Sequence, residues 1–390
     1  MAAQGPQAHQ APQSSDVLII GAGVFGLWAA YHLHQAGRRV AVIEAFEPAH
    51  GNASSGGESR VTRCGYGDQD RYTEWAGRAM YEWRALAGRA NLPLFNETGV
   101  LWIHPDGDPL VEANVKTLTN HNIPFQQLTP HQLRGRYPVL MVTDHEAGFF
   151  EPHGGCLMAR QAVRYLAREL QAGGVRFLPG EVAPIRAAAG DHGLLQSVTT
   201  TAGEPIAADQ FICACGPWLD RVCPDAMTSR LFVTRQEVVY FDVEGSASGD
   251  LPVWLDLPCY GMPNVTGRGF KVANDHHGPL VDIDTMDRAG SPEAGQQASE
   301  FLARRFPALA GSPVKEIEVC QYENSSNGDF VLDRHPGLDN VWLAGCGSGH
   351  GFKHGPAVGA HLAGLVLGKE QTIARFSLAS KQTRQQRAIQ

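Results

Sequence analysis

Asp16-Val-Leu-Ile-Ile-Gly21-Ala-Gly23-Val-Phe-Gly26 is an apolar run that ends in three glycines and opens into a helical pattern over residues 24–35. The helical pattern stops at Gly37, and a second apolar run, Arg39-Val-Ala-Val-Ile43, ends in Glu44. A strand, a glycine turn, a helix, a second strand and an acidic residue in this order are typical of a βα unit that binds a dinucleotide. The stretch therefore predicts an α/β fold of the Rossmann type.

The three glycines of this turn have separate expected roles. Gly21 allows the chain to turn tightly after the strand, Gly23 allows the backbone to approach a pyrophosphate, and Gly26 allows the helix to pack on the sheet. Glu44 is expected to face a ribose. The alternative is a Rossmann-like unit whose glycines serve packing alone, and this alternative leaves Glu44 unexplained.

Composition limits the classes of function. With 390 residues and 43% hydrophobic content, the chain can bury a large core and is expected to form about two domains. Its net charge of −8 argues against a general nucleic-acid or anionic-membrane surface. No run approaches roughly 18 consecutive apolar residues, and no basic start followed by an apolar block opens the chain. We therefore expect a cytoplasmic protein that acts on a small molecule.

The eight cysteines are scattered and include no CxxC pair, so we expect no disulfide framework. Cys213, Cys215 and Cys223 are close enough in sequence to suggest a zinc site. However, Gln210-Phe-Ile-Cys-Ala-Cys is typical of a buried strand with small residues. We favour the strand and expect no metal.

The βα alternation is interrupted twice. Residues 91–151 bring many prolines and short strand-like runs, and residues 226–325 are rich in strand patterns. These two segments are expected to form one substrate domain with a mostly antiparallel sheet, which makes the overall class α+β. The predicted nucleotide-binding domain is discontinuous and comprises residues 16–90, 152–225 and 326–380.

The two ends of the chain are expected to carry no chemistry. Residues 1–15 are rich in Gln, Ala, Pro and Ser and are predicted to be a disordered leader. Residues 381–390 are predicted to be a flexible tail for the same compositional reason.

A second glycine-rich loop lies near the other end of the chain. Val341-Trp-Leu-Ala-Gly345-Cys-Gly347-Ser-Gly349-His350-Gly351-Phe352-Lys353 precedes a helical pattern over residues 356–367. Such a loop offers backbone N–H groups and the positive end of a helix dipole to a phosphate or to a ring oxygen that gains negative charge. Two such loops favour one long cofactor, a flavin dinucleotide, over a nicotinamide dinucleotide.

Further motifs follow in order along the chain. They are Gly57-Glu-Ser-Arg60-Val-Thr-Arg63, Lys271 after Gly267-Arg-Gly-Phe, Cys320-Gln-Tyr322 and Gly349-His-Gly-Phe-Lys353. Together with the opening turn, they resemble monomeric sarcosine oxidase and N-methyltryptophan oxidase, which belong to the D-amino-acid-oxidase-like flavoproteins. The resemblance extends from about residue 16 to residue 376.

The resemblance implies roles for individual residues. Cys320 occupies the position of the cysteine that links FAD covalently in these relatives. Arg63 and Lys353 match the pair that binds the substrate carboxylate, and Lys271 matches the lysine that promotes the reaction with dioxygen. Tyr260 and Tyr322 match pocket walls. The expected cofactor contacts are Gly21, Gly23, Val24, Phe25, Gly26, Glu44, Arg60, Val182, Gly216, Cys320, Gly347, Gly349, His350, Gly351, Phe352 and Lys353.

Simple physical arguments accompany the resemblance. A guanidinium such as that of Arg63 offers two parallel donors to a carboxylate, although most arginines are solvated or ion-paired. Lys353 precedes a helix start, where a cation is disfavoured unless an anion binds. Lys271 could instead be the solvated face of a strand, and Cys320 could be an ordinary buried cysteine.

Two departures from the family pattern concern the expected pocket. A histidine familiar near the flavin is replaced by Gly56, and another near the active lysine is replaced by Asp275, with His276 and His277 just beyond it. The pocket is therefore expected to differ in shape and polarity, and sarcosine itself need not be the substrate.

The resemblance implies an FAD-dependent oxidase of a small secondary amine that bears a carboxylate. Candidate substrates are sarcosine, other N-methyl amino acids and cyclic imino acids. The expected partners are this amine and O2, with no nucleic acid and no membrane, and the chain is expected to be a monomer. The alternatives are an FAD-dependent dehydrogenase that passes electrons to another acceptor, a nicotinamide-linked dehydrogenase, and a flavin-binding subunit without turnover.

Overall fold

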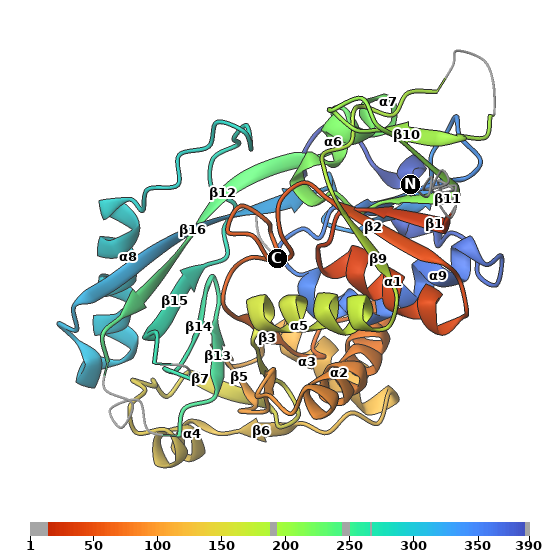
Figure 1. Cartoon of the computed structure of the whole chain (residues 1–390). Helices are drawn as coiled ribbons and strands as arrows, with labels where there is room; N and C mark the ends of the chain where they lie inside the picture. Colours follow the sequence, from red (N-terminus) through yellow and green to blue (C-terminus); the bar gives the residue numbers. More distant parts are fainter. Residues whose placement is uncertain (1–14, 188–192, 244–249, 266, 387–390) are drawn as a thin grey trace, which may run out of the picture.

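The computed structural model describes residues 15–187, 193–243, 250–265 and 267–386. Two large sheets lie side by side, and helices cover their outer faces (Figure 1). The fold is mixed α/β, as the sequence predicts. The predicted boundaries between the two domains stay a prediction.

The first sheet contains the nucleotide-binding unit. Its strand order is β17 (Val331–Arg334), β18 (Val341–Gly345), β11 (Pro205–Cys213), β1 (Ser15–Ile20), β2 (Val40–Glu44) and β9 (Arg176–Pro179), with β10 (Ser197–Thr199) beside β11. The pairs from β18 to β9 are parallel, whereas β17 and β10 are antiparallel to their neighbours. Parallel neighbours require crossover connections, and the helices that form these crossovers cover the sheet.

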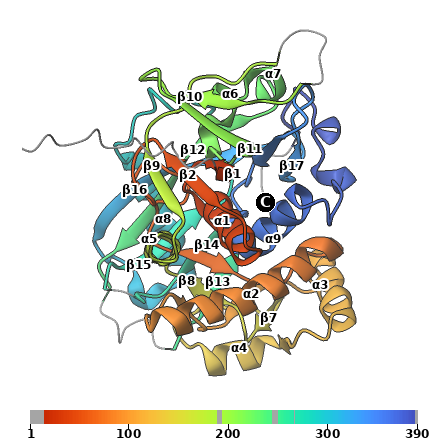
Figure 2. The same ribbon diagram turned by 45° about the vertical axis from the view of Figure 1, so that its right-hand side comes forward.

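Alternation along β1 divides its side chains between two cores. Val17 and Ile19 face the core that contains α1 (Val24–Gln35), α5 (Ala159–Ala172) and α9 (Gly355–Val366). Leu18 and Ile20 face the opposite core, which includes α6 (Leu219–Val222) and α7 (Pro224–Met227). Because both faces are buried, the strand is a continuous apolar run in the sequence. Figure 2 shows α1 beside α9 on one face of the sheet.

The second sheet has eight strands and is antiparallel except for one pair. Its order is β16 (Val314–Asn324), β12 (Phe232–Phe241), β15 (Phe270–Asn274), β14 (Cys259–Met262), β13 (Val253–Asp256), β5 (Val100–Pro105), β7 (Glu146–Glu151) and β6 (Gln126–Leu128). Only β13 and β5 pair in parallel. The sheet thereby joins the two segments that the sequence assigns to the substrate domain.

A third, small sheet connects segments from both predicted domains. It consists of β3 (Arg60–Thr62), β8 (Gly155–Leu157) and β4 (Phe95–Asn96). The long helix α2 (Asp70–Ala90) follows β3, and it was not expected from the sequence. The remaining helices are α3 (Pro109–Asn120), α4 (Pro130–Arg136) and α8 (Pro292–Arg305), with short 3-10 helices η1 (Gly216–Trp218), η3 (Pro307–Leu309), η4 (Phe352–His354), η5 (Ala374–Phe376) and η6 (Leu378–Ser380).

Both predicted end segments differ from expectation where they are described. Ser15 is the first residue of β1 and is buried, so the strand begins inside the predicted leader, whose residues 1–14 lie outside the described part. The predicted tail begins with Lys381, which is buried and donates to Arg375 O at 2.8 Å. The Gln386 N–H donates to Ser326 O at 2.9 Å. Residues 381–386 are therefore held by specific hydrogen bonds, because their polar side and main chains find partners in the body of the protein.

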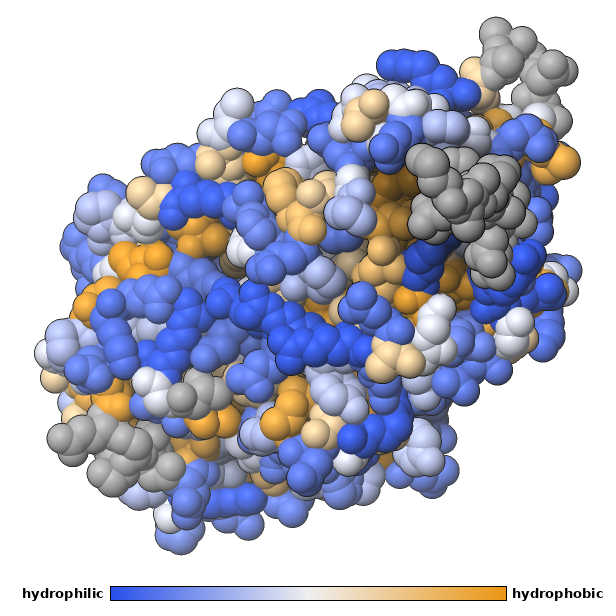
Figure 3. All heavy atoms as spheres, in the orientation of Figure 1, coloured by the Kyte–Doolittle hydropathy of each residue, from blue (hydrophilic) through white to orange (hydrophobic). Residues whose placement is uncertain are grey.

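The surface is mainly polar on the face shown in Figure 3, with hydrophobic residues in small groups between hydrophilic ones. Among the helices of the described residues, none has the length and apolar character needed to cross a membrane.

Candidate functional site

Two adjoining cavities lie between the first and second sheets. The larger has a volume of about 520 Å³ and the smaller a volume of about 130 Å³. Both cavities share part of their walls, and we call this shared wall the junction of the two cavities. The shared residues are Arg60, Tyr260, Lys271, Tyr322, Gly349 and Phe352.

The opening glycine turn forms one end of the larger cavity. Gly21 has φ +104°, and a Cβ atom there would collide with the carbonyl oxygen of Ala214. Gly23 lines the cavity, and a Cβ atom there would meet only Ser55 Oγ at 3.6 Å. The backbone at Gly23 is therefore accessible from the cavity, as an approaching phosphate requires.

Gly26 has a different place from the other two glycines. It does not line either cavity, and a Cβ atom there would collide with the carbonyl oxygen of Gly21. It allows α1 to pack against the end of β1. This geometry agrees with its expected packing role and does not support a direct cofactor contact.

Glu44 lies beside the same turn and lines the larger cavity. Its carboxylate accepts hydrogen bonds from the backbone N–H of Ala22 at 2.6 Å and of Phe46 at 3.1 Å. The hydroxyl of Ser55 accepts from Val24 N at 3.1 Å and also lines the cavity. Ser55 was missed in the sequence because a serine in a glycine- and serine-rich loop carries no distinctive spacing.

The second glycine loop forms the opposite wall. Cys346, Ser348 and Gly349 all have positive φ values, of 56°, 47° and 76°. A Cβ atom on Gly351 would lie 2.7 Å from the Cα atom of Gly347, so only glycine permits this close turn. The loop leads through η4 into α9, and its backbone faces the cavity.

Glu323 on β16 reaches the larger cavity between these two loops. It is 8% exposed, its Oε1 accepts from Gly347 N at 3.3 Å, and its Oε2 has no hydrogen-bond partner among the described residues. Burial raises the pKa of this carboxyl to about 7. A bound dinucleotide would supply the missing partner, so this orphaned oxygen and the two glycine loops fit a long cofactor such as FAD. Nothing in the sequence distinguishes Glu323 from other strand residues.

Lys271 and Cys320 lie on neighbouring parts of the second sheet and both line the larger cavity. The Lys271 ammonium donates to Ser59 O at 3.3 Å and to Ser59 Oγ at 3.4 Å. Burial, reinforced by Arg60, lowers the pKa of Lys271 to about 8. Burial raises the pKa of the Cys320 thiol, although Arg60 and Lys271 oppose this effect. The two cations do lower the thiol pKa, but desolvation is the larger effect.

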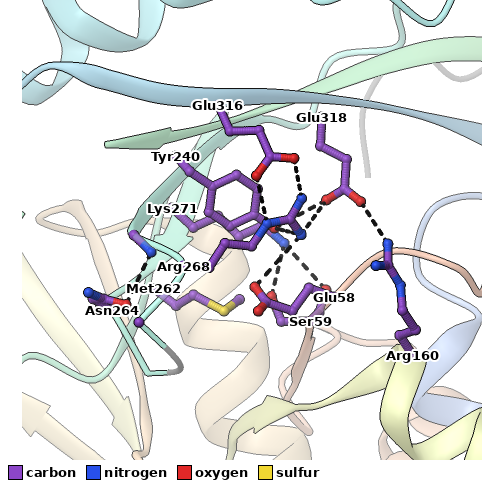
Figure 4. Close-up of polar contacts among 12 residues, drawn as sticks. Glu58, Ser59, Arg160, Tyr240, Met262, Asn264, Arg268, Lys271, Glu316 and Glu318 are labelled. Carbon is purple, nitrogen blue, oxygen red and sulfur yellow. Dashed lines mark hydrogen bonds and ion pairs between the residues drawn. The ribbon is translucent and has the colours of Figure 1, made fainter. Parts of the chain in front are cut away.

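A cluster of charged residues lies beside Lys271 (Figure 4). Arg268 donates to Glu316 Oε1 at 2.7 Å, to Glu318 Oε2 at 3.0 Å and to the Tyr240 hydroxyl at 3.2 Å. Arg160 lies on the other side of Glu318 at 3.4 Å. Arg268 also lies 3.8 Å from Glu58, so the cluster joins β12 and β16 to the residue before Ser59.

The smaller cavity contains the two predicted carboxylate-binding residues. The Arg63 guanidinium lies against the rings of Tyr66 and Trp102, at 4.5 Å and 4.7 Å from their centroids, and donates to Gly65 O. The Lys353 ammonium donates to the Tyr66 hydroxyl at 2.8 Å. Burial, and then the charge of Arg63, hold the pKa of Lys353 well below its usual range. An anion bound between these cations would be stabilised by both of them.

The opposite part of the smaller cavity is built by tyrosines and an acid. The hydroxyls of Tyr260 and Tyr322 are 3.4 Å apart, and Tyr322 donates to Asp275 Oδ1 at 3.2 Å. All three residues line the cavity. Burial is the main reason that the pKa values of both tyrosines are raised, so their hydroxyls stay protonated and available as donors.

Glu151 holds the loop that follows Arg63. This fully buried carboxylate accepts from the backbone N–H of Cys64 at 2.6 Å and of Gly65 at 3.1 Å. Its other oxygen accepts from Trp102 Nε1 at 2.9 Å. Glu151 therefore fixes both the backbone beside Arg63 and one of the rings that sandwich its guanidinium.

The structure brings the predicted residues together in two groups. Of the expected cofactor contacts, all but Gly26, His350 and Lys353 line the larger cavity. His350 and Lys353 line the smaller cavity with Arg63. Their individual roles toward cofactor and substrate stay predictions. Among the residues that line the smaller cavity, Tyr66 and Trp102 were not expected from the sequence.

Comparisons with known proteins agree with this geometry. A family model described as FAD dependent oxidoreductase matches residues 16–365. Monomeric sarcosine oxidase from Arthrobacter sp. (strain TE1826) is 29% identical over 96% of this chain and 98% of its own length. N-methyl-L-tryptophan oxidase from Yersinia pestis (strain Pestoides F) is 28% identical over 93% of this chain and 98% of its own length.

A solved structure has the same fold. L-proline dehydrogenase from P. horikoshii superposes with a TM-score of 0.82 and 19% identity, over 94% of this chain and 98% of that one. Because the family model spans most of the chain, the family is established. The chain belongs to the FAD-dependent oxidoreductases of the D-amino-acid oxidase type.

Proposed function

We propose that this protein is an FAD-dependent oxidase of a small secondary amine that bears a carboxylate, such as sarcosine, another N-methyl amino acid or a cyclic imino acid. The single observation that carries the proposal is the junction of the two cavities. A cavity that fits a dinucleotide shares the wall formed by Lys271, Tyr260 and Tyr322 with a small cavity that contains Arg63 and Lys353. Family membership indicates the class of redox reaction, and the two basic residues indicate that the substrate bears a carboxylate.

The larger cavity is proposed to hold FAD between the two glycine loops. When bound, FAD accepts a hydride equivalent from the carbon beside the amine and passes the electrons to dioxygen, which yields hydrogen peroxide. The resulting imine is hydrolysed by water to an aldehyde or keto product. We further propose that Cys320 is the site of covalent attachment, because Cys320 lines the larger cavity together with Lys271.

The residues of this chain would contribute orientation and charge. Arg63 and Lys353 would hold the substrate carboxylate, so that the carbon beside the nitrogen lies at the junction of the two cavities. The tyrosine pair would form the opposite wall and exclude water from this junction. Lys271 would place a positive charge beside the negative charge that develops on dioxygen.

The first experiment is an anaerobic screen of amines with the purified yellow protein. We expect loss of the flavin absorbance with at least one N-methyl or cyclic imino acid and no loss with the corresponding amine that lacks a carboxylate. A protein that binds FAD but is bleached by no amine would instead be a flavin-binding subunit, and the proposal would fail.

The second experiment distinguishes an oxidase from a dehydrogenase. We expect about one H2O2 for each substrate oxidised in air, and a Lys271→Met variant should be reoxidised by dioxygen at least ~100-fold more slowly while its anaerobic reduction persists. Substrate-reduced wild-type protein that stays colourless in air would favour the dehydrogenase alternative.

The covalent attachment has its own test. After acid precipitation, the yellow colour should stay with the wild-type pellet and leave the pellet of a Cys320→Ala variant. A colourless wild-type pellet would remove Cys320 from the proposal and leave the proposed activity unaffected.

We also propose that the protein is a monomer. Gel filtration is expected to give the mass of one chain, about 42.1 kDa.

A further inference from the structure

The smaller cavity contains an acid for which the proposed reaction has no role so far. Asp275 directly follows β15, is 6% exposed and lines this cavity. Its N–H donates to Pro258 O at 2.8 Å, and its Oδ1 accepts from the Tyr322 hydroxyl at 3.2 Å. These bonds from the main chain and the side chain fix the carboxylate in the cavity wall.

A carboxylate buried to this extent requires compensation by positive charge or hydrogen bonds. Arg63 and Lys353 line the same cavity. Burial lowers the pKa of Lys353 and Arg63 lowers it further, whereas Asp275 acts in the opposite direction. A substrate carboxylate that binds to both cations would balance their positive charge in place of Asp275. The Asp275 carboxylate would then need another positive partner, and the remainder of the substrate faces it.

We infer that Asp275 binds the positively charged nitrogen of the substrate. The inference rests on the proposed function and narrows its substrate class to amino acids that enter as zwitterions, with the cationic nitrogen close to the carboxylate. A cavity of about 130 Å³ keeps the two ends of such a ligand close to the two groups of opposite charge. Carboxylic acids of the same shape that lack the cationic nitrogen bind more weakly to this cavity.

The position of Asp275 also provides a route for one proton. An amine must have a free electron pair on nitrogen when the neighbouring carbon loses its hydride equivalent. The N–H bond of the bound ammonium breaks, the proton moves to the carboxylate of Asp275, and the electron pair stays on nitrogen. The receiving group is the carboxylate that also accepts from the Tyr322 hydroxyl.

The test uses two ligands that differ only in charge. Trimethylammonioacetate and 3,3-dimethylbutanoate have the same shape and carboxylate, but the first has a quaternary nitrogen where the second has carbon. Neither can transfer a proton from this atom. Their Kd values are measured by calorimetry on the flavin-loaded wild-type protein, on Asp275→Asn and on Tyr322→Phe. The last variant keeps the negative charge and loses only the hydroxyl that contacts it.

We expect the wild-type protein to bind the cationic ligand at least ~10-fold more tightly than its neutral isostere. In Asp275→Asn this ratio should fall toward 1, whereas Tyr322→Phe should keep most of it. The aromatic rings of the cavity also attract a quaternary nitrogen, but they do so equally in the wild type and in Asp275→Asn. The change in the ratio between these two proteins therefore isolates the carboxylate.

Two results would overturn the inference. If the ratio is the same in wild type and Asp275→Asn, Asp275 only balances the charge of Arg63 and Lys353, and both ligands should bind more tightly to the variant. If the wild-type protein binds neither ligand, the small cavity is not a zwitterion site. In either case, bleaching of the flavin by an N-methyl amino acid would leave the proposed oxidase function standing.

Discussion

The two cavities are built in different ways, and the difference explains how each can be recognised. The larger cavity includes main chain from two glycine loops, each local in sequence, at residues 21–25 and at residues 347–351, and we call it the main-chain cavity for this reason. The smaller cavity is formed by side chains from distant segments, including Arg63, Trp102, Asp275 and Lys353. Main-chain recognition depends on glycine spacing, whereas side-chain recognition depends on long-range packing. Main-chain recognition can therefore be predicted from the sequence, whereas side-chain recognition cannot.

The sharpest way to break the main-chain cavity is to add one methyl group at Gly21. Gly21→Ala places a Cβ atom against the Ala214 carbonyl oxygen and requires φ near +104°. We expect a loss of roughly 3–5 kcal/mol in the free energy of unfolding, together with loss of bound flavin. Urea titration and the flavin content of the purified protein measure these effects.

Gly37→Ala is the matched control for this substitution. Gly37 also has a positive φ, of 77°, but no atom lies within 4 Å of its Cβ position. It should cost only about 1 kcal/mol and leave the flavin bound. Equal costs at both positions would mean that the conformation alone, and not the close approach to Ala214, makes Gly21 necessary.

The corresponding change in the side-chain cavity is Arg63→Met. It removes the guanidinium but keeps apolar contact with Tyr66 and Trp102. We expect kcat/KM to fall about 100-fold to 1,000-fold, because a charged hydrogen-bonded partner of the substrate is lost, while flavin content stays unchanged. Loss of flavin in this variant would contradict the separation of the two cavities.

Glu323 contributes a side chain to the main-chain cavity. Its titration therefore tests the distinction between main-chain and side-chain recognition. Its pKa is raised from 4.5 to about 7 by burial, and the folded flavin-free protein therefore holds this proton more tightly than the unfolded chain. The associated stability is fully present below pH ~4.5 and is lost as pH rises through about 7.

Glu323→Gln removes this dependence, since an amide does not titrate in this range. Relative to the variant, the flavin-free wild-type protein should lose roughly 2–3 kcal/mol of unfolding free energy between pH 4.5 and pH 8. Urea unfolding at both pH values measures the difference. If the free energy of unfolding changes by the same amount with pH in both proteins, Glu323 is solvated in the absence of cofactor.

The smallest expected effect concerns a residue that contacts neither ligand. Glu151→Gln keeps the side-chain shape but replaces one acceptor oxygen with an NH2 group, which cannot accept a hydrogen bond. Either the bond from Trp102 or the bonds from Cys64 N and Gly65 N are therefore lost. We expect KM to rise about tenfold with a smaller change in kcat, because the position of Arg63 is loosened.

Asp108→Asn is a comparison of the same kind at a site outside both cavities. Asp108 accepts from Leu110 N at 2.8 Å as the N-cap of α3. It should affect stability slightly and leave KM unchanged. A change of KM in Asp108→Asn as large as that in Glu151→Gln would contradict a specific role for Glu151.

Much of the fold could be predicted from the sequence because its signals are local. The pattern over residues 24–35 coincides with α1, and the strand-rich segment 226–325 contains the strands β12 to β16. The long helix α2 was not expected, although its apolar residues follow a helical stripe that includes Tyr72, Trp75 and Trp83. The polar residues between them obscure this stripe.

The candidate site was predictable only in part. Arg63, Lys271, Cys320 and Lys353 were selected through family motifs, and the structure places all of them in the walls of the two cavities. Glu323 and Glu151 have no such motif. Their importance depends on burial and on which atoms contact them, and neither property is encoded in the spacing of neighbouring residues.

The sequence by itself determined the nucleotide-binding unit and the second glycine loop, because turns and buried strands impose local constraints on residue type. Only the tertiary structure decided that the two cavities share a wall, that burial outweighs nearby positive charge at Cys320, and that Asp275 shares a cavity with Arg63 and Lys353. These outcomes depend on distance and desolvation between residues far apart in sequence, and both are set only when the sheets pack together.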